Sequence, residues 1–226
     1  MRIDNGGARC RGLERAASFP LPAAPDDMDA LNLALFELLN SPSNAPDWLV
    51  TIATFCASDI ILVVPALLVL GWLLGDDASR RPLFEAFVAT LLALGVSGAI
   101  GALWPMPRPF MVPVGEYLLE HAATPAFPSN HLTIMLTMAF SLTLHDRTRR
   151  LGHALLVAAM PVAWARVYLG VHFPRDMIGA LMLAPTMAAL TGLGRVWLVT
   201  PPYERVVLRC HRTLFAPLIA RGWVRR

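Results

Sequence analysis

Three short stretches of this chain carry polar side chains whose types suit chemistry on a phosphate group. Guanidinium groups bind phosphate oxygens at two points, and a histidine can attack phosphorus or move a proton. A carboxylate nearby can orient such a histidine. These residues predict an anion site with its own acid and nucleophile: Arg108; Ser129, Asn130 and His131; and Arg166, His172 and Asp176.

The two arginines are the expected phosphate ligands. Arg108 precedes Pro109, and a single arginine at such a place often extends toward lipid headgroups. Arg166 lies in an otherwise apolar run, where an unpaired charge is costly and usually functional. Pairing of either arginine with Asp176 or Glu116 is the alternative to phosphate binding.

The second stretch, Pro128-Ser129-Asn130-His131, marks the start of a helix. Ser129 in that position caps the backbone, while the helix start turns N–H groups and the positive end of its dipole toward an anion. We therefore expect Ser129 and Asn130 to bind phosphate and His131 to stand over it as an acid. A simple hydrogen bond from His131 to a carbonyl is the alternative.

The third stretch places Asp176 four residues after His172, with Pro174 between them at a helix start. One helical turn lets Asp176 reach one ring nitrogen of His172 and leave the other as a nucleophile. The alternative is an aspartate that caps its own helix beside an interfacial histidine.

Composition shows which elements must position these residues. Of the 226 residues, 56% are apolar and 15% charged, and the mean hydropathy is +0.54, which excludes an ordinary cytosolic domain. A membrane-spanning helix needs about 20 apolar residues. Five segments approach that length, so we predict an all-α integral membrane bundle of about five transmembrane helices: 48 to 74, 83 to 104, 129 to 145, 151 to 171 and 175 to 199.

Two further parts flank this predicted bundle. Residues 1–27 have the composition of a disordered tail, and 28–40 have apolar residues at helical spacing beside polar ones. That second segment is predicted to be a helix in the membrane interface or one packed on the bundle. Residues 28–200 then form one membrane-embedded domain, followed by a basic cytoplasmic tail, 201–226.

Arginine placement predicts the orientation. Positively charged loops remain cytoplasmic. Twelve of the 19 positive side chains fall on one face of the predicted topology, and the loop 105–128 and the turn near 172 fall on the other. The candidate site is therefore expected on the extracytoplasmic face of the membrane, with the C-terminus in the cytoplasm.

Several function classes are excluded or disfavoured. All 19 positive residues are arginine, so mechanisms that need a lysine, such as Schiff bases and P-loop ATPases, are ruled out. The arginines are scattered between apolar runs, which argues against nucleic-acid binding. The three cysteines lack metal-site spacing, and we expect no metal, no cofactor and no obligate protein partner.

The same residues resemble the three-part signature of the type 2 phosphatidic acid phosphatase superfamily. More narrowly, "PRPF", "HAATPAFPSNH" and "ARVYLGVHFPRD" are similar to bacitracin-resistance-type undecaprenyl-diphosphate phosphatases. The resemblance implies a polyprenyl diphosphate substrate, attack by His172, protonation of the leaving group by His131 and no metal. Arg108, Ser129 and Arg166 would hold the phosphate oxygens.

Three positions depart from the superfamily pattern. Gly101 stands where the signature has a lysine, Ala165 where a serine is usual, and Asn130 where a glycine is usual. His121 and Glu116 are candidate replacements for the lysine, although ordinary loop roles are favoured for both.

Other activities remain open. Another lipid phosphatase or a lipid phosphotransferase fits the same residues. A transporter or lipid-binding subunit is suggested by Asp59 inside the first predicted span.

Overall fold

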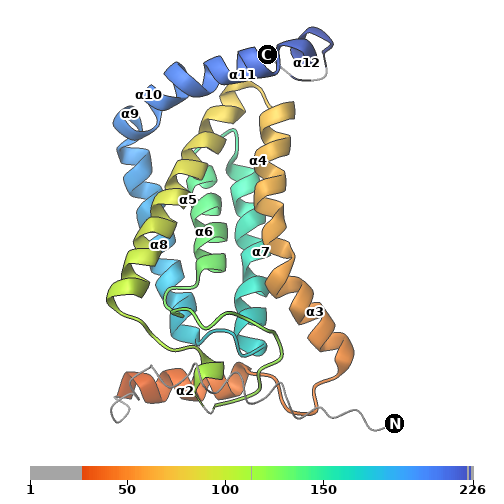
Figure 1. Ribbon diagram of the computed structural model, residues 1–226, viewed down its shortest axis with the longest axis vertical. Coiled ribbons are helices and arrows are strands. Elements are labelled where there is room, and N and C mark those ends of the chain that lie inside the picture. The colour runs from red at the N-terminus through yellow and green to blue at the C-terminus, as the bar shows by residue number, and fades with distance from the viewer. Residues whose placement is uncertain (1–26, 113, 223, 225–226) are drawn as a thin grey trace.

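The computed structural model describes residues 27–112, 114–222 and 224, and the predicted disordered tail, 1–27, lies outside them except for Asp27. Throughout the described part the regular elements are helices (Figure 1). The N-terminal and bundle helices are α2 (Asp27–Leu39), α3 (Asp47–Ser58), α4 (Val63–Leu74), α5 (Asp77–Leu103), α6 (Asn130–Thr143), α7 (Arg149–Tyr168) and α8 (Pro174–Leu193). The prediction of an all-α membrane bundle is confirmed.

Four helical stretches are long and apolar enough to cross a membrane, namely Asp47–Leu74, Asp77–Leu103, Arg149–Tyr168 and Pro174–Leu193. The chain is a multi-pass membrane protein. The third predicted span, 129 to 145, is the 14-residue helix α6, which is shorter than expected. It ends at Thr143 because the following turn is closed by Thr148, whose hydroxyl donates to the Leu142 carbonyl at 2.9 Å.

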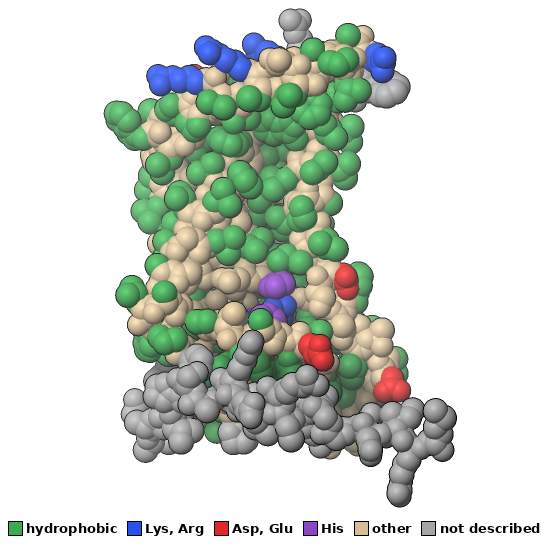
Figure 2. All heavy atoms as spheres, viewed as in Figure 1, with side chains coloured by type: hydrophobic (Ala, Val, Ile, Leu, Met, Phe, Trp, Pro, Cys, Tyr) green, Lys and Arg blue, Asp and Glu red, His purple; other side chains and the backbone are tan. Residues whose placement is uncertain are grey.

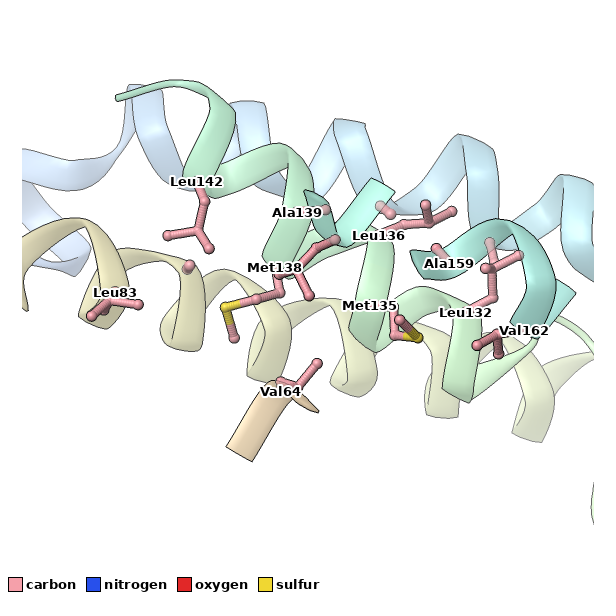
Figure 3. Packing of buried hydrophobic residues seen from close by; sticks show 14 residues of the cluster. Val64, Leu83, Leu132, Met135, Leu136, Met138, Ala139, Leu142, Ala159 and Val162 are labelled. Carbon is pink, nitrogen blue, oxygen red and sulfur yellow. The ribbon is translucent and has the colours of Figure 1, made fainter. Parts of the chain in front are cut away.

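Helix α6 lies at the centre of the bundle, packed against α5, α7 and α8. Its apolar side chains Met135, Met138 and Leu142 are fully buried, and Ala159 and Val162 of α7 pack against the same cluster (Figure 3). Because its neighbours cover it, α6 does not need the length of a lipid-exposed span.

The first span is bent where α3 meets α4. A short 3₁₀ turn, Ile60–Leu62, joins the two helices after Asp59. Pro65 follows at once, and a proline has no N–H with which to continue the helical ladder. Asp59 is exposed on the outside of the bend and does not line the interior of the bundle.

The two ends of the bundle differ. Helix α2 lies across one end, where its buried Phe36 contacts Phe173 edge to face at 5.0 Å between ring centroids (Figure 1). Helix α2 therefore packs on the bundle, as one of the two alternatives for this segment expected, while Leu31 and Leu38 stay exposed. Its place in the membrane interface stays a prediction.

A series of short helical segments crosses the opposite end: α9 (Arg195–Leu198), α10 (Thr200–Pro202), η4 (Tyr203–Val207), α11 (Leu208–Leu214) and α12 (Ala216–Ala220). Basic side chains gather there (Figure 2). The last span was predicted to reach residue 199, but α8 ends at Leu193 because the chain turns at Gly194. The segment expected as a tail is thus helical along this end.

Candidate active site

The three polar stretches meet at the end of the bundle that α2 covers. Backbone hydrogen bonds join them: Ser129 N–H donates to the Asp176 carbonyl at 3.2 Å, and His172 N–H donates to the Arg166 carbonyl at 3.1 Å. Arg108 reaches the same point from the loop after α5, with its Nη1 3.0 Å from His172 Nε2. Figure 2 shows histidine and arginine side chains together at this end.

His172 is buried, and its neighbours determine which ring nitrogen carries the proton. Arginine N–H groups only donate, so Nε2 must be the acceptor from Arg108. Nδ1 therefore carries the hydrogen and donates it to Asp176 Oδ2 at 3.0 Å. The same oxygen accepts the Phe173 N–H at 3.0 Å, which holds the carboxylate in place. The predicted His172–Asp176 pair is present, with Nε2 as the basic nitrogen.

Arg108 holds the loop over the site as well as contacting His172. Its Nε donates to the Thr124 carbonyl at 2.9 Å, and its Nη2 contacts both Thr124 Oγ1 and the Pro125 carbonyl. Nη1 also donates to the Val171 carbonyl at 3.2 Å. An incoming phosphate must therefore take over the N–H that now points at His172.

Arg166 differs from Arg108 because two of its nitrogens, Nε and Nη2, have no hydrogen-bond partner. It is 2% exposed, and its Nη1 donates to the Ala57 carbonyl at 2.9 Å, in the last turn of α3 where carbonyls lack helical partners. Its Nε and Nη2 are buried without a hydrogen-bond partner, and so is the hydroxyl of fully buried Ser129. Unpaired buried donors are costly, so this cluster is suited to an anion.

Ser129 occupies the N-cap position of α6, as predicted, but its side chain makes no capping bond. Asn130 is directed elsewhere: its Oδ1 accepts the Ser97 hydroxyl of α5 at 2.7 Å. His131 is half-buried and close enough to Arg166, His172 and His121 to be affected by their charges. The structure thus gathers six of the seven predicted side chains and pairs the seventh, Asn130, with α5.

His121 is the site residue to which sequence reasoning assigned an ordinary loop role. Its ring centroid lies 6.4 Å from that of His172, with the ring planes at 70°. Glu116 stays apart, because Asn40 at the end of α2 accepts its N–H and donates to its carbonyl. No spacing rule linked His121 to the signature residues, since a loop of irregular shape carries it.

Two glycines allow the loop that carries His121 to pack closely against the rest of the protein. Gly170, at φ +73°, lies so close to the Glu116 carbonyl that a Cβ would collide with it. A Cβ on Gly101 would meet Pro125 at 3.3 Å, so this position faces the loop and has little room for a long side chain. The departure at Gly101 is thus part of how the loop 112–128 packs.

Burial and neighbouring positive charges determine the protonation states of His172 and Arg108, which both lie in loops between helices. Burial, followed by the charges of Arg108, Arg166 and His121, holds the pKa of His172 well below its usual value. Burial lowers the pKa of Arg108 to about 10, partly offset by Asp176. His172 is therefore neutral and Arg108 positive at neutral pH.

An apolar cavity of about 210 Å³ lies between α6, α7 and α8. Leu132 and Met177, which follow His131 and Asp176, line its inner end, and the exposed Met160, Ile178 and Leu181 line its outer side. The cavity thus reaches the exposed apolar surface of the bundle.

Within residues 27–112, 114–222 and 224, the structure contains no group of three or more His, Cys, Asp or Glu side chains arranged to hold a metal ion. The positive charge of the site comes from the two arginines.

Two solved structures share the fold of this protein. The crystal structure of Aquifex aeolicus LpxE aligns with a TM-score of 0.58 and 22% identity, over 72% of this chain and 95% of that one. The first transmembrane PAP2-type phosphatidylglycerolphosphate phosphatase from Bacillus subtilis aligns with a TM-score of 0.50 and 20% identity, over 81% of this chain and 92% of that one. Both likenesses concern the fold.

The sequence is more specific. Residues 82–200 match the PAP2 superfamily, and the chain belongs to this superfamily. It is 38% identical to the candidate undecaprenyl-diphosphatase YbjG of Escherichia coli K12, over 88% of this chain and 99% of that protein. The undecaprenyl-diphosphatase BcrC of Bacillus subtilis is 29% identical over 68% of this chain and 79% of its own length. The predictions of the superfamily and of a membrane lipid phosphatase are confirmed.

Proposed function

We propose that this protein hydrolyses undecaprenyl diphosphate to undecaprenyl phosphate and inorganic phosphate. The observation that carries the proposal is the basic Nε2 of His172, together with the unpaired buried donors of Arg166 and Ser129, whose backbones are joined to Asp176 and His172. The identity of the lipid is taken from the names of the similar proteins of Escherichia coli and Bacillus subtilis.

In the proposed reaction, His172 Nε2 attacks the terminal phosphorus, and the bond from this phosphorus to the bridging oxygen breaks. The bridging oxygen leaves with the electron pair on undecaprenyl phosphate and takes a proton from His131. Asp176 stabilises the positive charge that develops on His172, while Arg108, Arg166 and Ser129 hold the equatorial oxygens.

Water completes the cycle. His131, now neutral, accepts a proton from the water that attacks the phosphohistidine, and the phosphorus–nitrogen bond breaks to release phosphate. The proton taken from water restores the acid form of His131 for the next turnover, and the negative charge of the bound phosphate groups stabilises that form against the nearby arginines. Asn130 contributes its backbone N–H at the helix start, because its side chain is bound to Ser97.

The cavity between α6, α7 and α8 supports a lipid substrate, because its lining is apolar and includes Leu132 and Met177, the residues that follow His131 and Asp176. We propose that residues 28–200 form this phosphatase unit and that it works without an obligate protein partner.

We further propose an extracytoplasmic site in a bacterial inner membrane. The site lies at one end of the bundle, and most of the described arginines lie at the other, which the positive-inside rule assigns to the cytoplasm. The exposed Cys210 of α11 is a natural reporter of that end. In a variant with Cys10→Ser and Cys56→Ala, an impermeant maleimide should label Cys210 only after cells are opened, whereas Glu120→Cys should be labelled in intact cells.

The enzymatic proposal is tested with purified protein in detergent. Wild type should release phosphate from undecaprenyl diphosphate, and His172→Ala should not. Adding lipid acceptors distinguishes a hydrolase, which releases free phosphate, from a phosphotransferase. Release by His172→Ala at the wild-type rate would refute the assignment.

A further inference from the structure

His121 is a third histidine at the candidate site, and no step of the proposed reaction uses it. It is half-buried, whereas His172 is 1% exposed and Ser129 is fully buried. The residues after it, 122–125, are exposed. His121 therefore lies at the rim, between the deep phosphate ligands and the outside of the bundle.

The hydrogen bonds of the loop determine what His121 presents to a ligand. Its Nδ1 is 3.0 Å from the Ala122 carbonyl, and because a carbonyl only accepts, Nδ1 carries the hydrogen. Nε2 is thus the ring atom left for a ligand. The backbone N–H of His121 donates to Tyr117 Oη, which leaves the phenol O–H as a second donor beside it.

The loop is held firmly enough to position both side chains. Leu118 N–H donates to the Leu169 carbonyl at 3.2 Å. The side chain of Asn40 accepts the Glu116 N–H and donates to the Glu116 carbonyl. The Tyr117 ring lies against Phe110 at 4.5 Å between centroids, and Arg108 holds Thr124 at the far end of the loop.

We propose that His121 and Tyr117 form a subsite for the second, lipid-bearing phosphate of a diphosphate. This inference rests on the proposed function and adds a specificity determinant to it. The deep donors of Arg166 and Ser129 take the terminal phosphate, so the second phosphate, which is joined to the lipid chain, must lie closer to the rim. His121 and Tyr117 are the ring side chains that the loop presents there.

The charges around His121 make its protonation state depend on whether a diphosphate is bound. Burial, together with the charges of Arg108 and Arg166, lowers the pKa of His121, so it is neutral in the ligand-free protein. A diphosphate offsets both arginines, and His121 then takes up a proton and donates from Nε2. His131 and His172 lie close by, and Glu120 is the carboxylate near Tyr117.

The test compares a one-phosphate with a two-phosphate probe. Inorganic phosphate and the non-hydrolysable methylenediphosphonate are titrated calorimetrically into purified wild type, His121→Ala, His121→Asn and Tyr117→Phe. His153→Ala serves as the matched control, because His153 is an exposed histidine near the start of α7, at the other end of the bundle. Kinetics with undecaprenyl diphosphate are measured on the same preparations.

We expect His121→Ala to weaken methylenediphosphonate binding about tenfold, as for loss of one hydrogen bond to a charged group, and inorganic phosphate binding less than twofold. KM for undecaprenyl diphosphate should rise in proportion, with a smaller change in kcat. His121→Asn, which retains a donor, should recover part of the loss, and His153→Ala should match wild type.

Equal weakening for both probes, or no weakening, would overturn the subsite. A thermal unfolding midpoint of His121→Asn close to that of wild type ensures that a loss is not a folding defect. If wild type fails to hydrolyse undecaprenyl diphosphate, the proposed function fails, but the two binding probes still decide whether a second-phosphate subsite exists.

Discussion

Arg108 donates a hydrogen bond to Nε2 of His172 across 3.0 Å, and this contact makes Nε2 the basic nitrogen of the ring. Asp176 completes the arrangement from the other side by accepting from Nδ1. The lone pair that attacks phosphorus in the proposed reaction is thus held in place but covered by an N–H in the ligand-free protein. A bound phosphate would draw that N–H onto its own oxygen and expose the nucleophile.

Replacing Asp176 with asparagine should reverse this arrangement. An asparagine amide that donates to Nδ1 moves the ring proton to Nε2, where it faces the N–H of Arg108. We expect kcat to fall about 10⁴-fold, as when the orienting carboxylate of a catalytic triad is replaced by its amide. Stopped assays of phosphate release measure the loss. A fall of less than tenfold would mean that the proton position on His172 does not matter.

A covalent intermediate should form on His172. With ³²P in the terminal phosphate, acid-unstable and base-stable label should appear on wild type after rapid quenching. His131→Ala should accumulate less product, because the leaving group lacks its acid, with kcat reduced about 10²–10⁴-fold. His172→Ala should carry no label, and label that persists in this variant would exclude His172 as the nucleophile.

The pH dependence follows from the lowered pKa of His172. Since burial and the positive charges of Arg108 and Arg166 favour the neutral ring, the acidic limb of kcat/KM should lie below pH 6.5, the ordinary histidine value. Arg108→Gln removes one positive neighbour, so that limb should move to higher pH while kcat/KM falls about 10²–10³-fold. An unchanged acidic limb in Arg108→Gln would contradict the electrostatic account.

The same lowered pKa affects stability. The unfolded chain binds a proton at His172 more readily than the folded one, so this residue stabilises the fold above pH 6.5. That contribution is lost progressively as pH falls from about 6.5 toward the folded-state pKa. Thermal unfolding midpoints between pH 5 and 8 should therefore drop more steeply for wild type than for His172→Gln. Parallel curves would count against the assignment.

The cavity between α6, α7 and α8 should accept the prenyl chain. Ala163→Phe would fill its lining with a larger side chain and should reduce kcat/KM for undecaprenyl diphosphate about tenfold, with a much smaller effect on a short-chain diphosphate. Val157→Phe, at an exposed position of the same helix, is the control. Similar losses for long and short chains would place the chain elsewhere.

Removal of divalent metals should leave phosphate release unchanged. The two arginines provide positive charge, and the part of the chain that the structure describes has no cluster of three metal-ligating side chains. Assays with and without EDTA, followed by Mg²⁺ addition, test this. Turnover that disappears with EDTA and returns with Mg²⁺ would replace the metal-free mechanism.

The sequence by itself determined that the chain forms an all-α membrane bundle and that Asp176 reaches His172. These depend on local properties, namely hydrophobic length and the reach of side chains one helical turn apart. Helix ends were less certain because turns set them: α6 ends early at the Thr148 turn, and α8 at Gly194.

Only the tertiary structure decided which donors in the site are already used. Arg108 is satisfied by a loop sixteen residues away, Arg166 is anchored by one bond to α3, Asn130 is bound to Ser97, and His121 faces His172. Such contacts join segments far apart in the chain through an irregular loop. No periodic pattern encodes them, because they depend on how α3, α5 and the loop 112–128 pack around α6.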